Sequence, residues 1–186
     1  INNFKNHKNW LGYYSDKYFG SKQVDFDFQL RNGMIIKVPR RLMQTYKELF
    51  FDETYTKGFS TQFNREKQMN VLDIGANVGY FSLFMAAMFP KSNIFAFEPM
   101  PMNFKQLKQY QSENSAINFT IANQAVSKEI GSITLNYDAN DSFYSIGAGR
   151  GVNPETIDGD GNIECDSFFS IGTRELENNN NTYFYI

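Results

Sequence analysis

The chain has 186 residues, of which 41% are hydrophobic and 17% aromatic, and its formal net charge is −2. This length fits one domain with a sizeable buried core, and the composition argues against disorder. The near-balance of 18 basic and 20 acidic residues gives no electrostatic reason to expect a nucleic-acid partner. A single cysteine, Cys165, and a single histidine, His7, argue against an internal disulfide, a metal site and a histidine-based triad.

No run of residues approaches the ~20 apolar residues that a membrane-spanning helix needs. The first residues also lack the charged-then-apolar pattern of a secretory signal. Together with the lone cysteine, these features predict a cytoplasmic location.

The first part of the chain predicts a small N-terminal unit, residues 1–56, that precedes the main domain. Residues 1–23 are polar with scattered aromatics and suit a helix or an arm. A period-two alternation then predicts a strand, and Asn32-Gly33 favours a tight hairpin turn. Apolar residues at helical spacing follow. The predicted elements are strands at 24–30 and 34–38 and a helix at 41–51.

Residues 57–186 predict a domain in which short apolar strands alternate with helices. This alternation predicts parallel pairing with right-handed crossovers, and hence an α/β sheet with helices on both faces. The predicted strands are 71–74, 93–98, 117–121 and 132–136, and the predicted helices are 80–89 and 101–115.

The end of the chain predicts less regular structure. Residues 137–162 are rich in Gly and Asp and predict a long loop, and Asp166-Ser167 has the pattern of a helix N-cap. An apolar strand begins at Thr182 and the sequence stops at Ile186. We expect the natural domain to continue, so that its later strands are missing from this sequence.

A glycine-rich turn, Asp73-Ile74-Gly75-Ala76-Asn77-Val78-Gly79, follows the first strand of the main domain. Glycine lets the backbone turn sharply and approach a ligand closely. Ligands of open α/β sheets bind at the carboxyl ends of the strands, where the strand order reverses. Glu98 ends the next strand, about 20 residues further on, where a carboxylate can accept hydrogen bonds from both hydroxyls of a ribose.

Two other nucleotide-binding motifs fit this turn less well. The dinucleotide fingerprint is G-x-G-x-x-G, but Asn77 and Tyr80 stand at its second and third glycine positions. A P-loop needs G-K-S/T, which does not follow the turn. Asp73 suits a cationic sulfonium and an amino group better than a pyrophosphate.

The segment Val71–Tyr80, followed by Phe95-Ala96-Phe97-Glu98-Pro99-Met100-Pro101, closely resembles the FkbM family of class I S-adenosylmethionine-dependent methyltransferases. The resemblance runs from about Arg41 to the end of the chain and includes Ala125-Val126-Ser127. It implies a Rossmann-like, doubly wound and mostly parallel sheet. It also implies O-methylation of a hydroxyl on a sugar, glycan or natural product.

The resemblance also implies which residues hold S-adenosylmethionine. Asp73 would face the amino-acid end, Glu98 the ribose, and Met100, next to Pro99, the adenine ring. The full set of cofactor residues expected from the resemblance is Asp73, Gly75, Ala76, Asn77, Gly79, Tyr80, Phe81, Glu98, Pro99, Met100, Asn123, Gln124 and Ala125.

The catalytic group is not identified by the sequence. Members of the family carry an acid beside the methyl group, in a segment that would follow the strand at Tyr183, and this sequence ends before it. Asp141 and Ser142, in the long loop, are weak candidates. Two alternatives to a methyltransferase stay open: a non-catalytic module that binds S-adenosylmethionine, and an NAD-dependent oxidoreductase.

Overall fold

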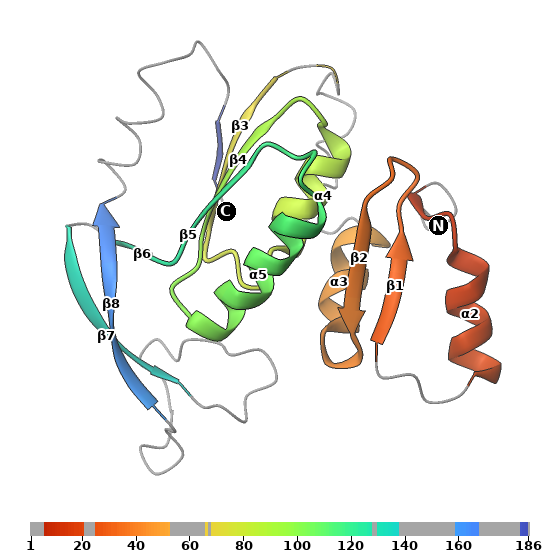
Figure 1. The fold of residues 1–186 in the computed structure, drawn as a ribbon, viewed down its shortest axis with the longest axis horizontal. Coiled ribbons are helices and arrows are strands. Elements are labelled where there is room, and N and C mark those ends of the chain that lie inside the picture. Colours follow the sequence, from red (N-terminus) through yellow and green to blue (C-terminus); the bar gives the residue numbers. More distant parts are fainter. Residues whose placement is uncertain are drawn as a thin grey trace.

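The computed structural model describes residues 6–20, 25–52, 66, 68–127, 130–137, 159–167 and 183–185. Figure 1 shows how the helices and strands within these ranges are arranged. In the described residues, no helix is long and apolar enough to cross a membrane.

The central sheet has four parallel strands in the order β5-β4-β3-β9. Its members are β3 (Asn70–Ile74), β4 (Asn93–Phe97), β5 (Phe119–Ala122) and β9 (Tyr183–Tyr185). The chain moves outward from β3 to β4 and β5, and β9 then pairs with the other side of β3. The strand order therefore reverses beside β3, and ligands of such sheets bind at this point. The predicted α/β fold with a parallel sheet is confirmed.

Two helices, α4 (Tyr80–Met88) and α5 (Pro101–Glu113), connect β3 to β4 and β4 to β5. Both lie on the same side of the sheet in Figure 1, as right-handed crossovers between successive neighbouring strands require. Seven of the nine residues of α4 are buried, because this helix is packed between the sheet and the N-terminal unit. In contrast, α5 buries one stripe and exposes its other side.

The N-terminal unit has the hairpin and the helix that the sequence predicts. It contains α2 (Trp10–Phe19), β1 (Asp25–Gln29), β2 (Ile35–Pro39), the short 3₁₀ helix η1 (Arg40–Leu42) and α3 (Met43–Phe50). The strands β1 and β2 pair antiparallel, and Gly33 in their turn has a φ of 98°. Helix α3 packs against α4, which joins the hairpin to the main sheet. The predicted domain boundary, between residues 56 and 57, lies outside the described residues.

His7 is fully buried, although it comes from a polar stretch of sequence. Its Nε2 lies 2.8 Å from the hydroxyl oxygen of Tyr46. The ring also makes edge-to-face contacts with Phe28, Phe50 and Phe51. His7 therefore has a structural role, in which it fixes the start of the described chain to α3.

One hydrophobic core extends from the hairpin through α3 and α4 to the central sheet. Tyr46 on α3 stacks on Phe28 of β1, with the ring centroids 4.5 Å apart. The same tyrosine meets Tyr80 at the start of α4 edge to face, at 5.5 Å. Contacts of this kind hold α3 over the carboxyl end of β3, where a ligand is expected.

A second sheet follows β5 in the chain, and it shows that two predictions were wrong. It consists of β6 (Ala125–Ser127), β8 (Gly159–Ser167) and β7 (Gly131–Tyr137) in that order. Residues 159–162, expected at the end of a long loop, pair with β7, and Asp166-Ser167, expected as a helix N-cap, end β8 beside Val126 and Ser127. Pairing with distant strands overrides the local preference of a Gly- and Asp-rich segment.

Candidate functional site

The glycine-rich turn between β3 and α4 depends on backbone conformations that most residues avoid. Gly75, Asn77 and Gly79 have φ values of 80°, 52° and 90°. Asparagine tolerates this left-handed region better than most residues other than glycine. A Cβ added to Gly75 would meet nothing within 4 Å, so the backbone there borders open space. A Cβ on Gly79 would lie 2.4 Å from Cδ1 of Leu107, so this glycine lets α4 begin close to α5.

The backbone N–H groups of the turn all have hydrogen-bond acceptors, either within the turn or at the end of β4. Those of Gly75 and Ala76 both donate to the carbonyl oxygen of Phe97, at 2.9 and 3.0 Å. The N–H of Asn77 donates to Glu98, that of Val78 to the Asn77 side chain, and that of Gly79 to the Ala76 carbonyl. None of these five donors is therefore left to bind a phosphate group.

A cavity of about 210 Å³ opens beside this turn. One wall is formed by the end of β3, the turn and the start of α4, and the other by η1 and α3. The residues that line it are Leu42, Thr45, Leu49, Asp73, Gly75, Ala76, Asn77, Val78, Tyr80 and Phe81. Six of the residues predicted to bind the cofactor thus meet around one cavity: Asp73, Gly75, Ala76, Asn77, Tyr80 and Phe81. The wall from η1 and α3 was not predicted.

Of the described residues that line the cavity, Asp73 is the one that is acidic, and it is 2% exposed. The hydroxyl of Ser82 donates a hydrogen bond of 2.6 Å to its Oδ2. Burial raises the pKa of Asp73 to about 6; hydrogen bonds from Ser82 oppose this rise, and the nearby charge of Glu98 adds to it. A carboxylate that is costly to bury alone is well suited to receive a cationic ligand group.

Glu98 is also buried, at 3% exposed, but it does not line the cavity. Its Oε2 accepts the N–H of Asn77 at 2.7 Å, and its Oε1 accepts the N–H of Met100 at 2.9 Å. The side chain of Asn103 donates to Oε1 at 3.3 Å. Burial raises the pKa of Glu98, and these three hydrogen bonds oppose the rise. In this structure the carboxylate therefore ties the glycine-rich turn to the start of α5.

The remaining predicted cofactor residues lie outside the cavity lining: Gly79, Pro99, Met100, Asn123, Gln124 and Ala125. The side chain of Asn123 donates to the carbonyl oxygens of Glu98 and Pro99, at 2.8 and 3.0 Å. Met100 and Ala125 are buried, and Gln124 is half-buried. The weak catalytic candidates Asp141 and Ser142 lie outside the described residues.

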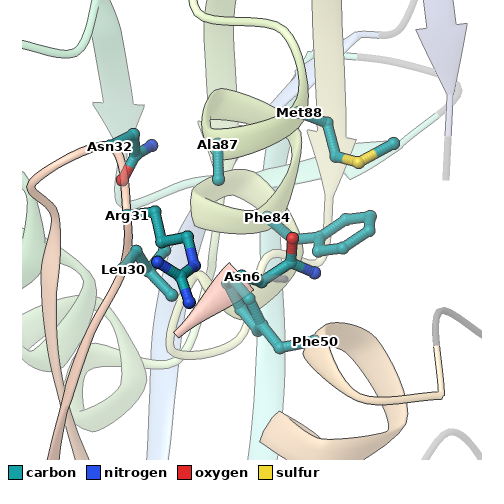
Figure 2. Close-up of a pocket in the computed structure, with 8 residues that line it drawn as sticks. All are labelled: Asn6, Leu30, Arg31, Asn32, Phe50, Phe84, Ala87 and Met88. Atoms are coloured by element: carbon teal, nitrogen blue, oxygen red, sulfur yellow. The ribbon is translucent and has the colours of Figure 1, made fainter. Parts of the chain in front are cut away.

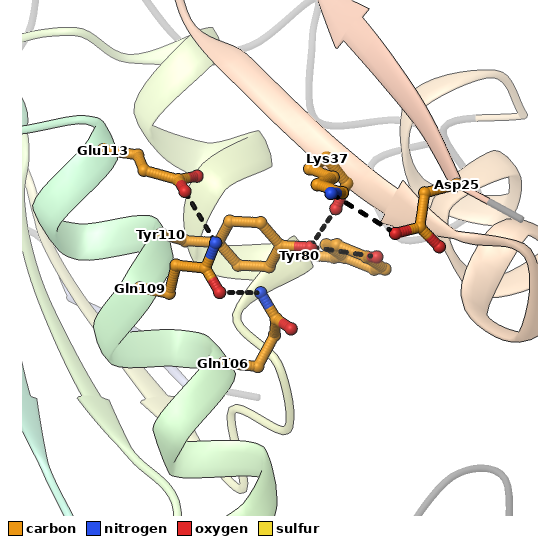
Figure 3. Close-up of polar contacts among 7 residues, drawn as sticks. All are labelled: Asp25, Lys37, Tyr80, Gln106, Gln109, Tyr110 and Glu113. Atoms are coloured by element: carbon orange, nitrogen blue, oxygen red, sulfur yellow. Dashed lines mark hydrogen bonds and ion pairs between the residues drawn. The ribbon is translucent and has the colours of Figure 1, made fainter.

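Tyr80 is held by a chain of hydroxyl contacts that reaches the N-terminal hairpin (Figure 3). The hydroxyl of Tyr110 donates to the carbonyl oxygen of Lys37 on β2. Since its proton is used there, the hydroxyl of Tyr80 is the donor in the 3.4 Å contact with Tyr110. Burial raises the pKa of Tyr80 far above its ordinary value and that of Tyr110 to about 12. Neither tyrosine can serve as an ionised base near neutral pH.

A second cavity, of about 180 Å³, lies near the other end of α4 (Figure 2). Its lining residues are Asn6, Leu30, Arg31, Asn32, Phe50, Phe84, Ala87 and Met88. The side-chain oxygen of Asn32 already accepts a hydrogen bond of 3.1 Å from the backbone N–H of Met34. None of the eight residues is a nucleophile or a general base, so the cavity beside Asp73 is the better candidate for chemistry.

Comparison with known proteins finds a similarity to part of a curated methyltransferase. The chain is 34% identical over 96 residues to Methyltransferase sdnD of Sordaria araneosa, a match that covers 51% of this chain and 35% of that relative. The resemblance to methyltransferases predicted from the sequence is thus confirmed. The chain spans about a third of the length of this relative. No family model matches the chain.

Solved structures give only distant likenesses. The crystal structure of Methyltransferase FkbM from Methylobacillus flagellatus KT aligns with a TM-score of 0.40 and 14% identity, over 70% of this chain and 31% of that one. The P. horikoshii protein TYW2, in complex with MeSAdo, aligns with a TM-score of 0.36 and 18% identity, over 57% and 38%. Likenesses this distant carry no argument about function.

Proposed function

We propose that this chain is the cofactor-binding part of an S-adenosylmethionine-dependent methyltransferase that transfers a methyl group to a hydroxyl oxygen of a sugar, glycan or natural product. The observation that carries this proposal is the cavity at the strand-order reversal, whose lining combines the buried Asp73 with a glycine-rich turn. The match to a curated methyltransferase supports the same reaction class.

The charges around the cavity favour this cofactor over a dinucleotide. A pyrophosphate is bound by free N–H groups of a glycine-rich turn and of the helix that follows it, but the five turn N–H groups of residues 75–79 already have partners. The carboxylate of Asp73 would also repel a phosphate. The amino group of S-adenosylmethionine carries positive charge. It would stabilise the charge of the Asp73 carboxylate, which has lost its contact with water because the residue is buried.

The Glu98 carboxylate has room for only one of the two ribose hydroxyls while its present hydrogen bonds are kept. A carboxylate offers about four acceptor positions, and three N–H donors already occupy the two oxygens of Glu98. One ribose hydroxyl could be added directly, whereas a second would have to displace a donor. We expect the 3.3 Å contact from Asn103 to be the one that is released, because it is the longest of the three.

The cofactor, when bound, supplies an activated methyl group on a sulfonium. The contribution of the protein is then mainly to position the acceptor in line with the methyl carbon. Thr45 on α3 lies in the cavity wall opposite the turn, so its hydroxyl is available to a polar ligand group. Transfer to a hydroxyl also benefits from a general base, and we assign that role to none of the described residues.

Isothermal titration calorimetry with S-adenosylhomocysteine and with NAD tests this proposal. We expect S-adenosylhomocysteine to bind and NAD not to bind. Binding of NAD alone would show that the protein is a dinucleotide-binding protein. Tight binding of S-adenosylhomocysteine, together with no transfer of labelled methyl groups to any of a panel of hydroxyl compounds, would instead favour a non-catalytic binding module.

A further inference from the structure

Ser82 is a polar residue in the first turn of an otherwise apolar helix. It is the third residue of α4, is 0% exposed, and follows Tyr80 and Phe81, which line the cavity. Its hydroxyl donates to Oδ2 of Asp73 at 2.6 Å, and its backbone also donates to that carboxylate. A hydrogen bond this short between an O–H group and a carboxylate is of the strong, charge-assisted kind.

Ser92 shows that burial of a serine in this protein does not by itself create such a contact. Ser92 is 3% exposed, and within the described residues its hydroxyl has no hydrogen-bond partner. Ser82 differs because its hydroxyl meets a carboxylate that lines the cavity. The two serines therefore form a natural pair for comparison.

We propose that Ser82 is a positioning residue for cofactor binding, which holds the Asp73 carboxylate ionised and oriented so that it can receive the amino group of the ligand. This inference rests on the proposed function. No sequence motif marks Ser82. If the inference holds, binding requires that Asp73 has lost its proton.

The groups around Asp73 determine the direction of this dependence. Among the described residues, Glu98 at the end of the neighbouring strand is the one charged group that acts on Asp73, and its negative charge favours the neutral acid. From η1 and α3 the cavity receives Leu42, Thr45 and Leu49, none of which is charged. Burial raises the pKa of Asp73 to about 6, and Ser82 is the group that opposes this rise.

Removal of the hydroxyl in Ser82→Ala should therefore raise the pKa of Asp73 further, by roughly one, since a hydrogen bond to a charged group contributes about as much as one pKa unit. At about pH 6 this shift lowers the ionised fraction about fivefold, and at about pH 8 it lowers it less than twofold. The affinity for S-adenosylhomocysteine should change by the same factors. Ser82→Cys, a weaker donor, should give an intermediate shift, and Ser92→Ala should give none.

Two measurements on each variant test the inference. The first is an NMR titration of the Asp73 side-chain carboxyl in the protein without ligand, and the second is calorimetry with S-adenosylhomocysteine between about pH 5.5 and pH 8. A higher titration midpoint in Ser82→Ala, together with an affinity loss confined to low pH, supports the inference.

The failures can be told apart. An Asp73 midpoint in Ser82→Ala equal to that in Ser92→Ala would overturn the inference, and so would an equal loss of affinity at both ends of the pH range, which indicates a merely structural role. If the midpoint shifts as expected but the unaltered protein does not bind S-adenosylhomocysteine, the proposed function fails, and with it the cofactor part of this inference.

Discussion

The substitution Asp73→Asn should stabilise the protein near neutral pH while it weakens ligand binding. The carboxyl has a pKa of about 6 in the folded state against an ordinary value of 3.8, mainly because it is buried. A pKa difference of about two corresponds to roughly 3 kcal/mol. Folding therefore favours the neutral acid, and ionisation at higher pH costs free energy. Asparagine has no charge to bury and keeps an oxygen that can accept the Ser82 hydroxyl.

The sign of the pH dependence follows from the raised folded-state pKa. The contribution of Asp73 to stability is fully present below about pH 4 and is lost as the pH rises through about 6. Asp73→Asn should thus raise the free energy of unfolding by about 2–3 kcal/mol at about pH 8, and hardly at all at about pH 4. Urea denaturation followed by circular dichroism across this range measures the difference.

Asp27→Asn provides the control, because Asp27 lies on β1 with an exposed side chain. It changes the net charge by the same amount without altering the cavity. If Asp73→Asn is no more stable than Asp27→Asn at about pH 8, ionisation of the buried Asp73 carboxyl does not destabilise the fold as we argue. A gain that persists at about pH 4 would equally refute the reasoning. The affinity for S-adenosylhomocysteine should fall in Asp73→Asn alone.

Two further substitutions test the turn and its partner. Glu98→Ala should weaken binding of S-adenosylhomocysteine by roughly 1.5–3 kcal/mol, the range for hydrogen bonds to a charged group; unchanged affinity in calorimetry would show that the ribose assignment is wrong. Gly79→Ala should lower the melting temperature more than Gly33→Ala, since both force a left-handed φ but only the first adds a clash, with Leu107 at 2.4 Å. Equal losses in the two variants would mean that close packing at Gly79 contributes nothing.

Local sequence patterns were sufficient to predict the central sheet. Strands such as Asn93–Phe97 are short apolar runs, and the helix from Pro101 begins at a proline, which is favoured in a first turn. The second sheet could not be predicted in the same way. Residues 159–167 become a strand through pairing with 125–127 and 131–137, which lie far away in sequence.

The candidate site was predictable on one side only. The turn from Asp73 to Gly79 and the acid at Glu98 are marked by residue type and spacing. The opposite wall, with Thr45, comes from α3, and no local signal indicates which helix covers the end of a sheet. The signal that could have revealed Ser82 was its hydroxyl within an otherwise apolar helix, since a buried hydroxyl needs a partner.

Glu98 connects the ends of three successive strands, and this connection affects how a ligand can bind. Its carboxylate holds Asn77 after β3 and Met100 before α5, and its carbonyl oxygen accepts the side chain of Asn123 after β5. A ribose hydroxyl that displaces Asn103 would bind the same carboxylate that holds the N–H of Asn77, so any movement of Glu98 on binding is passed to the turn. Since the same turn borders Asp73 in the cavity wall, binding at the ribose end and at the amino-acid end should be coupled. A ligand that lacks one end should therefore lose more affinity than the contacts of that end alone provide.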